Sequence, residues 1–170
     1  MRLFEDARLT LIRILFVCHG NICRSPMAEF VMKELTRQAG LEDQFIISSA
    51  ATTTEELGND IYPNAKEELK RRGIPFDRRR ARQIRSDEYN DWDYIIAMDD
   101  ENLYDINYII GNDPQHKVRL LMSFTGKNSS VSDPWYTRNF ARAYNDIYQG
   151  CEALLTQCIS LRQGVNETQE

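Results

Sequence analysis

The sequence predicts a single α/β domain in which a four-stranded parallel sheet carries helices on both faces. Four short apolar runs rich in β-branched residues are spread along the 170-residue chain. Helical patterns lie between these runs, which is typical of parallel strands joined by crossover helices. No repeat or low-complexity tract divides the chain. A chain of this length buries a sizeable core without disulfides or a structural metal.

The first strand is predicted at Leu11–Cys18, which is almost continuously apolar. Ser25 and Pro26 are expected to begin a helix, because proline is tolerated in the first helical turn. Apolar residues then recur at the spacing of one buried helical face: Met27, Phe30, Val31 and Leu35. We expect Gly40 to end this helix in a left-handed conformation.

The alternation of strands and helices continues along the chain. Further strands are predicted at Phe45–Ser48, Trp92–Met98 and Val118–Ser123. Further helices are predicted at Asn64–Gly73, Asp100–Ile106 and Arg138–Leu161. The last helix is expected to bury one apolar face, made of Phe140, Tyr144, Ile147, Cys151, Leu154 and Cys158.

These patterns divide the chain into an N-terminal extension at residues 1–10, one domain at 11–163 and a C-terminal tail at 164–170. The net charge of -5 argues against a protein that coats nucleic acid. No run approaches the ~20 apolar residues of a membrane span, and no signal peptide is evident. Four unevenly placed cysteines are too few for a disulfide framework, which predicts a reducing, cytoplasmic setting. We also expect a monomer without membrane or nucleic-acid partners.

The stretch VCHGNICRSPMAEF, residues 17–30, lies where the first strand meets its helix. Open parallel sheets bind ligands beyond the carboxyl ends of their strands, which is where this stretch falls. Cys18 and Arg24 form a C-x5-R pattern followed directly by Ser25. A loop of this length can turn backbone N–H groups inward, and the helix N-terminus adds partial positive charge. The pattern therefore predicts an anion-binding loop with a thiol at its base.

The residue types in this loop suit that chemistry. The Arg24 guanidinium can bind two phosphate oxygens at once. Gly20 allows close backbone approach, Asn21 can tie the loop together, and Ser25 can donate a hydrogen bond to a thiolate. Because N–H donors and positive charge favour the thiolate form of a cysteine, Cys18 is a candidate nucleophile.

Other kinds of site fit this loop less well. Zinc sites use ligand spacings such as C-x2-C together with further cysteines or histidines. Cys18 and Cys23 do not have this spacing, and the only histidines are His19 and His116. A redox C-x-x-C motif and the nucleotide P-loop signature are both absent. A buried structural cysteine would be the ordinary interpretation of Cys18 alone, but the whole constellation at a strand end argues against it.

The motif FVCHGNICRSPMAE resembles the active-site signature of the low-molecular-weight protein tyrosine phosphatases. The resemblance extends, in family order, through SSAAT at 48–52, ARQI at 81–84, DYIIAMDDEN at 93–102 and SDPWY at 132–136. It implies a flavodoxin-like α/β fold, a phosphotyrosine phosphatase activity, no cofactor and no metal. Its implied partners are phosphotyrosine proteins or peptides, with inorganic phosphate as product and competitive ligand.

The resemblance also implies roles for individual residues. Cys18 would form a phosphocysteine, Arg24 would bind the phosphoryl oxygens, and Asp133 would act as general acid and then as general base. The phosphate-binding loop would consist of His19, Gly20, Asn21, Ile22, Cys23 and Ser25, with Ser49 supporting it. Pro134 would stiffen the loop that presents Asp133. That role is chemically reasonable, because a carboxylic acid can protonate a departing phenolate.

The chain departs from the family pattern at several positions. Arg79 stands where many relatives carry a structural histidine, so we expect altered support of the site with little effect on its chemistry. Glu55 and Glu56 fall in a loop where relatives often place an aromatic residue that walls the pocket. Trp135 and Tyr136 follow Asp-Pro, and both are expected to border the pocket as aromatic surfaces.

Eight basic residues lie between residues 70 and 85. They could form a docking surface for acidic peptides, but a solvated surface paired with nearby acids is the expected interpretation.

Three alternatives to a tyrosine phosphatase remain at this stage. Arsenate reductases of this fold need further cysteines midway along the chain, but none lies between Cys23 and Cys151. Protein arginine phosphatases usually carry threonine where this chain has Ile22. A non-catalytic anion-binding module would be expected to have lost Cys18 or Asp133, and both are present.

Overall fold

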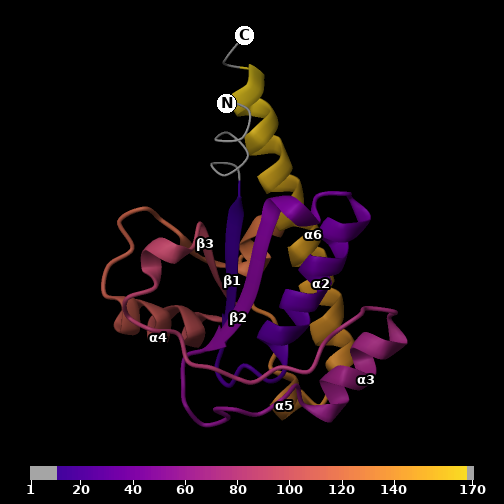
Figure 1. The fold of residues 1–170 in the computed structure, drawn as a ribbon. Coiled ribbons are helices and arrows are strands. Elements are labelled where there is room, and N and C mark those ends of the chain that lie inside the picture. The colour runs from indigo at the N-terminus through magenta and orange to yellow at the C-terminus, as the bar shows by residue number, and fades with distance from the viewer. Residues whose placement is uncertain (1–10, 168–170) are drawn as a thin grey trace.

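The computed structural model describes residues 11–167, so the expected N-terminal extension lies outside the described residues, as do residues 168–170. The strands are β1 (Ile12–Cys18), β2 (Phe45–Ala51), β3 (Tyr94–Ala97) and β4 (Val118–Leu120). All of them are parallel, in the order β2-β1-β3-β4, which confirms the predicted four-stranded sheet. Figure 1 shows helices on both sides of this sheet.

The helices also follow the predicted order. They are α2 (Arg24–Gln38), α3 (Pro63–Arg71), α4 (Asp100–Ile110), α5 (Pro134–Thr137) and α6 (Phe140–Glu167). The short helix α5 was not predicted, and α6 continues beyond the predicted end at Leu161 through residues 164–167 of the expected C-terminal tail. Short 3-10 helices lie at η1 (Glu42–Gln44), η2 (Tyr89–Asp91) and η3 (Leu121–Thr125). Among the helices of residues 11–167, none is long and apolar enough to cross a membrane.

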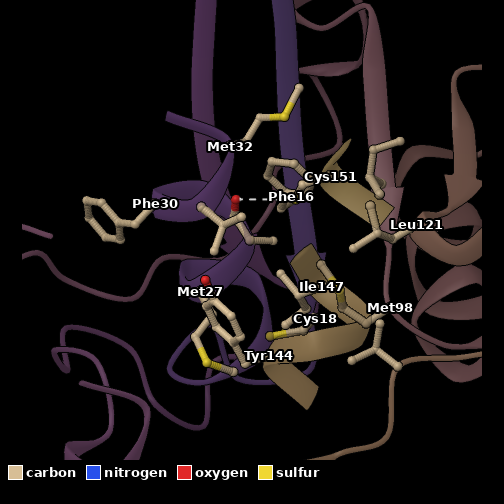
Figure 2. Packing of buried hydrophobic residues seen from close by; sticks show 14 of the residues in the cluster. Phe16, Cys18, Met27, Phe30, Met32, Met98, Leu121, Tyr144, Ile147 and Cys151 are labelled. Carbon is tan, nitrogen blue, oxygen red and sulfur yellow. Dashed lines mark hydrogen bonds between the residues drawn. The ribbon is translucent and has the colours of Figure 1, made fainter. Parts of the chain in front are cut away.

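Strand β1 is buried on both faces, because its alternate side chains enter two separate cores. Ile14 and Phe16 join the larger core with α2 and α6, whereas Leu15 and Val17 join the smaller core beside α4. Figure 2 shows the larger core, in which Met27 and Phe30 of α2 and Ile147 and Cys151 of α6 are labelled. The six residues predicted for the apolar face of the last helix are all buried. The near-continuous apolar run of β1 is thus explained by a two-sided parallel sheet.

The first helix ends as predicted. Gly40 has a φ of 71°, a left-handed conformation that glycine adopts without a steric penalty. Its N–H donates to Arg37 O at 3.0 Å, and Leu41 N donates to Thr36 O at 2.8 Å. These bonds satisfy carbonyl groups at the end of α2.

The prediction of a strand over Val118–Ser123 was too long. Only residues 118–120 pair with β3, and the chain then turns into η3. The last pair of that ladder is Ala97 with Leu120, so the following residues have no neighbouring strand to join. The Ser123 and Thr125 hydroxyls instead donate to carbonyl groups three residues earlier, at 2.6 Å each, which favours a tight helical turn.

Strand β2 and helix α4 are longer than predicted. Residues 49–51 continue β2 because they pair with residues 16–18 of β1. Helix α4 continues to Ile110 and ends at Gly111, whose φ is 85°. The extension of β2 carries Ser49 to the edge of the sheet where Cys18 ends β1.

Candidate active site

The residues of the predicted anion site meet at the carboxyl edge of the sheet. The loop between β1 and α2 forms the floor of an open pocket of about 170 Å³. The pocket is lined by Cys18, His19, Gly20, Ile22, Cys23, Arg24, Glu55, Glu56, Asp99, Glu101, Asn102, Asp133, Trp135 and Tyr136. The other predicted site residues, Asn21, Ser25 and Ser49, are buried behind this surface.

The carbonyl groups of the loop are engaged by neighbouring segments. Cys18 O accepts from Thr52 N at 2.9 Å, and His19 O accepts from Thr53 N at 3.2 Å. On the opposite side, Ile22 O accepts from the backbone N–H of Tyr62 at 2.9 Å. With these carbonyls bonded outward, the loop can direct backbone N–H groups into the pocket, as an anion nest requires.

Asn21 holds the loop together from within. Its φ of 58° is left-handed, which is uncommon for a residue other than glycine, and its side chain is buried. The amide Nδ2 donates to Ser25 Oγ and to Ser49 Oγ, both at 2.9 Å. The Oδ1 accepts from Arg82 N at 3.2 Å. The polar atoms of this buried side chain are therefore satisfied, which stabilises the sharp turn of the loop.

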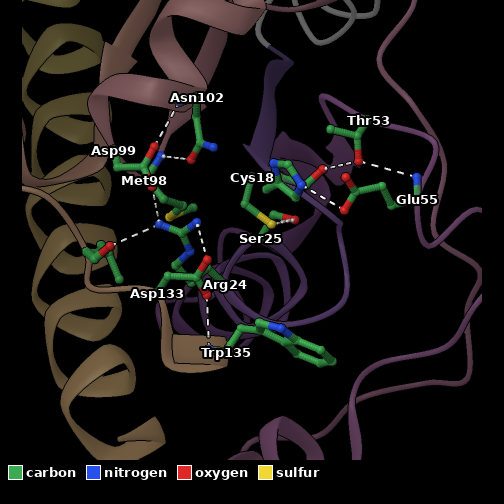
Figure 3. Close-up of polar contacts among 12 residues, drawn as sticks. Cys18, Arg24, Ser25, Thr53, Glu55, Met98, Asp99, Asn102, Asp133 and Trp135 are labelled. Atoms are coloured by element: carbon green, nitrogen blue, oxygen red, sulfur yellow. Dashed lines mark hydrogen bonds and ion pairs between the residues drawn. The ribbon is translucent and has the colours of Figure 1, made fainter. Parts of the chain in front are cut away.

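Cys18 lies at the base of the pocket and is only 3% exposed. Its Sγ is 3.0 Å from Ser25 Oγ, so the Ser25 hydroxyl can donate to a thiolate at this position. Figure 3 shows Cys18 and Ser25 side by side, with Arg24 on the neighbouring wall. This arrangement suits a nucleophile beneath a bound anion.

The Arg24 guanidinium is buried and held by two acidic side chains (Figure 3). Nη1 donates to Asp99 Oδ2 at 2.6 Å and to Val131 O at 3.0 Å, while Nη2 donates to Asp133 Oδ2 at 3.4 Å. Burial opposes the charge, but the Cys18 sulfur and the two carboxylates outweigh it and raise the pKa of Arg24 above its ordinary value. Arg24 is therefore a permanent cation in the pocket.

Three residues that line the pocket were not predicted from the sequence, Asp99, Glu101 and Asn102, and of these Asp99 contacts Arg24. Asp99 directly follows Met98 and caps α4, since its Oδ1 accepts from Asn102 N at 2.8 Å. Its Oδ2 remains to bind Arg24. Its position just after a predicted strand could have indicated a site residue, because parallel strands bring their carboxyl ends to one edge of the sheet.

Asp133 lies on the short turn that opens α5. Its Oδ1 accepts from Trp135 N at 3.0 Å, and its Oδ2 faces Arg24. Pro134 occupies the first position of α5 and is buried. Trp135 packs edge-on against Tyr62, with ring centroids 5.1 Å apart, and remains 45% exposed. The turn thus presents both a carboxyl group and an indole ring to the pocket.

Part of the pocket rim is acidic. Glu55 and Glu56 line it, and Glu55 Oε2 lies 2.9 Å from His19 Nε2. This contact joins the phosphate-binding loop to the loop that follows β2 (Figure 3). The loop that follows β2 therefore contributes carboxylates to the pocket lining.

Cys23 is the second thiol of the loop. Burial, aided by the neighbouring Cys18 and Asp133, raises the pKa of Cys23 to about 12. Cys23 is therefore a neutral thiol at physiological pH. All four cysteines are free and buried.

Neighbouring carboxylates neutralise part of the basic stretch at residues 70–85. The ion pairs are Arg71–Glu68 at 3.2 Å, Arg72–Glu68 at 2.9 Å, Arg82–Glu88 at 3.0 Å and Arg85–Asp87 at 3.0 Å. These pairs agree with the expectation of a surface paired with nearby acids.

Cysteine-dependent phosphatases are the class of enzyme that this fold and pocket define, because they place a thiol under an anion-binding loop beside an arginine. The family model described as low molecular weight phosphotyrosine protein phosphatase matches residues 13–166. The chain belongs to this family, as its sequence motifs predicted.

Individual relatives agree with this assignment. The chain is 40% identical over 147 residues to the low molecular weight protein-tyrosine-phosphatase YfkJ of Bacillus subtilis, covering 85% of this chain and 94% of YfkJ. The crystal structure of YfkJ matches with a TM-score of 0.84, covering 88% of this chain and 96% of that one. The low molecular weight phosphotyrosine protein phosphatase of Gallus gallus is 36% identical over 84% of this chain and 92% of its own.

A further match is the structure of an arginine phosphatase from drosophila, with 31% identity and a TM-score of 0.79. It covers 86% of this chain and 97% of the drosophila chain. The fold is thus shared by phosphatases named for different phosphorylated residues, so substrate choice depends on the pocket.

Proposed function

We propose that this protein hydrolyses phosphotyrosine in proteins or peptides through a phosphocysteine intermediate, with Cys18 as the nucleophile. The observation that carries the proposal is the Cys18 sulfur at the base of the loop, 3.0 Å from the Ser25 hydroxyl. In the first step a bond forms between Cys18 Sγ and phosphorus while the bond from phosphorus to the tyrosine oxygen breaks. Asp133 donates the proton that the departing phenolate requires.

In the second step a water molecule attacks the phosphocysteine, and the ionised Asp133 accepts its proton. The bond from sulfur to phosphorus breaks, which regenerates the Cys18 thiolate and releases inorganic phosphate. Arg24 and the backbone N–H groups of the loop bind the phosphoryl oxygens in both steps and stabilise their developing charge. Asn21, Ser25 and Ser49 act as supports that keep the loop in its anion-binding shape.

The walls of the pocket favour an aryl phosphate as the substrate. Trp135 and Tyr136 offer ring surfaces against which a phenol can stack. Ile22 adds an apolar side chain to the same pocket, at the position where arginine phosphatases usually carry threonine. Glu55, which also lines the pocket, leaves the wall more polar than in relatives that carry an aromatic residue on this loop.

The test is a panel of peptides that carry phosphotyrosine, phosphoserine or phosphoarginine, with arsenate reduction measured alongside. We expect phosphotyrosine to be hydrolysed with the highest kcat/KM and inorganic phosphate to inhibit competitively. Cys18→Ser should abolish turnover without unfolding the protein, and Arg24→Ala should be nearly as damaging. A preference for phosphoarginine would reassign the substrate, and substantial activity in Cys18→Ser would move the chemistry elsewhere.

The setting that we propose is the cytoplasm, with the phosphatase acting as a monomer through one domain at residues 11–163. Four free thiols are compatible with a reducing compartment. The chemistry above uses only side chains, backbone and water, so the proposal requires no cofactor, and it involves neither a membrane nor a nucleic acid.

A further inference from the structure

Tyr62 links the phosphate-binding loop to the Asp133 turn, by which we mean residues 133–138. Tyr62 directly precedes α3, and its backbone N–H donates to Ile22 O at 2.9 Å. Its ring packs edge-on against Trp135, with centroids 5.1 Å apart, and stacks on Phe140 with centroids 6.0 Å apart. Tyr62 therefore contacts three separate parts of the chain: the phosphate-binding loop, the Asp133 turn and the start of α6.

Arg138 ends the Asp133 turn in an uncommon backbone conformation. Its φ of 58° and ψ of 14° are left-handed, a region that few residues other than glycine and asparagine adopt. The Arg138 N–H donates to Pro134 O at 2.9 Å, which closes the single turn of α5. Backbone strain of this kind persists only where surrounding contacts hold it in place. The side chain of Arg138 supplies such contacts.

The Arg138 guanidinium lies over the aromatic rings that surround it. Its central carbon is 5.4 Å from the ring centroid of Tyr62, 5.8 Å from that of Phe140 and 5.9 Å from that of Trp135. Its Nη2 donates to the Tyr62 hydroxyl at 2.9 Å, and its Nη1 lies 3.5 Å from Trp135 O. A guanidinium suits this place, because it is attracted to ring faces and donates hydrogen bonds from a fixed planar fork. One side chain thus joins the end of the turn to the residue that contacts the phosphate-binding loop.

The orientation of the Asp133 carboxyl group depends on the same turn. Its Oδ1 accepts from Trp135 N at 3.0 Å, and its Oδ2 accepts from Arg24 at 3.4 Å (Figure 3). The first of these contacts is made within the turn, whereas the second crosses to the phosphate-binding loop. A displacement of the turn relative to that loop would therefore move the carboxyl group relative to Cys18.

We propose that Tyr62 and Arg138 are positioning residues that clamp the Asp133 turn against the phosphate-binding loop, so that the Asp133 carboxyl group is held ready to protonate the leaving group. Neither residue is among those that line the pocket. The inference deepens the proposed function, since its kinetic part rests on Asp133 as the general acid. The rigidity of the turn, in contrast, can be measured without any substrate.

The kinetic experiment compares phenyl phosphate with an ester that has a very acidic leaving group. The measured quantity is kcat/KM, which reports the step in which the leaving group departs, and only the phenolate requires the proton of Asp133. A general acid contributes roughly a hundredfold to ten-thousandfold, and a loosened acid should lose only part of this. We therefore expect Arg138→Asn to lower kcat/KM about fivefold for phenyl phosphate and less than about twofold for the acidic ester.

Asparagine is chosen at position 138 because it tolerates the left-handed backbone, so the variant removes the guanidinium without adding strain. The matched control is Arg142→Asn, which removes the same charge from an exposed position on α6. It should change neither kcat/KM value.

Two further variants test the contact between the clamp residues. Tyr62→Phe removes the hydroxyl acceptor but keeps the ring, and it should lower kcat/KM for phenyl phosphate about twofold, as loss of one exposed hydrogen bond predicts. Because Arg138 acts through Tyr62, the double variant should lose no more than Arg138→Asn alone. Arg138→Lys keeps a positive charge over the rings but lacks the planar fork, so its kcat/KM should lie between those of the wild type and Arg138→Asn.

Fluorescence anisotropy measures the clamp directly. The chain has two tryptophans, Trp92 and Trp135, so Trp92→Phe leaves Trp135 as the sole reporter. In this background we expect the anisotropy of Trp135 to fall in Arg138→Asn and to stay unchanged in Arg142→Asn. Near-ultraviolet circular dichroism checks the fold of each variant. If Arg138→Asn does not fold, Tyr62→Phe and Arg138→Lys test the same contact.

An unchanged ratio of the two kcat/KM values in a folded Arg138→Asn protein would overturn the inference, as would an equal change in Arg142→Asn. Strictly additive losses in the double variant would also overturn it, because Tyr62 and Arg138 would then act independently. Failure of the proposed function looks different. In that case the wild-type protein would hydrolyse neither ester, while the anisotropy of Trp135 would still depend on Arg138.

Discussion

Replacing Asp99 by asparagine tests how the pocket holds Arg24 in place. Asparagine retains a side-chain oxygen that can cap α4 by accepting from Asn102 N, as Asp99 Oδ1 does now at 2.8 Å. It removes the charged acceptor that binds Arg24 at 2.6 Å. Arg24 then keeps only Val131 O at 3.0 Å and the longer contact with Asp133 at 3.4 Å. The change therefore isolates the ion pair from the helix cap.

The expected size of the effect follows from burial. The Arg24 side chain is 3% exposed and that of Asp99 is 24% exposed, so the pair is only partly screened by water. A hydrogen bond to a charged partner contributes about 1.5–3 kcal/mol, and a neutral amide recovers part of that. We therefore expect the free energy of unfolding to fall by about 1–2 kcal/mol without phosphate. Bound phosphate supplies new acceptors for Arg24, so the deficit should shrink when phosphate saturates the site.

Folding and phosphate binding are thermodynamically linked, so a variant whose loss of stability shrinks in saturating phosphate must bind phosphate more tightly than the wild type does. A difference of about 1–2 kcal/mol corresponds to roughly a 5- to 30-fold lower inhibition constant for phosphate. The assay is urea denaturation with and without saturating phosphate, together with product inhibition; Asp100→Asn, a charge change one residue away, is the control. An equal loss of stability with and without phosphate would refute the reasoning, because Asp99 would then act only through the fold.

Three further predictions concern the rim and the surroundings of the pocket. Asp133→Ala should slow phenyl phosphate at least tenfold more than an ester with a very acidic leaving group, measured as kcat; equal losses would indicate a positioning role. Glu55→Trp should lower KM for aryl phosphates about threefold and shift preference towards acidic peptides, because it restores an aromatic wall and removes a carboxylate; unchanged values would exclude Glu55 from substrate contact. Asp60 is partly buried, which opposes its ionisation, but Lys66 Nζ at 2.6 Å and two backbone N–H groups outweigh this and lower its pKa to about 2. Ionised Asp60 therefore stabilises the folded state at any pH above 3.8, the ordinary pKa of an aspartate. This contribution is lost as the pH falls towards the lowered pKa of about 2. Asp60→Asn should accordingly lower the melting temperature at pH 7 and converge with the wild type near pH 2; a constant difference across that range would contradict the assignment.

The sequence by itself determined the parallel α/β class and the centre of the candidate site. Both depend on information that is local in the chain. Apolar runs and helical periodicity report burial within one element, and the near-continuous apolar run of β1 directly reflects a strand that is buried on both faces. The C-x5-R-S motif is equally local, because residues 18–25 include a strand end, a complete anion-binding loop and a helix start.

Only the tertiary structure decided which distant side chains complete the site. Asp99 meets Arg24 across 75 positions because β3 pairs with β1 in parallel and their carboxyl ends share an edge. Arg79 meets Asn21 across 58 positions because residues 79–82 run beside the loop. The true end of β4 likewise depended on where its partner β3 stopped, at Ala97. Propensity and periodicity describe a residue and its near neighbours, whereas strand pairing and the reach of a guanidinium depend on segments that folding alone brings together.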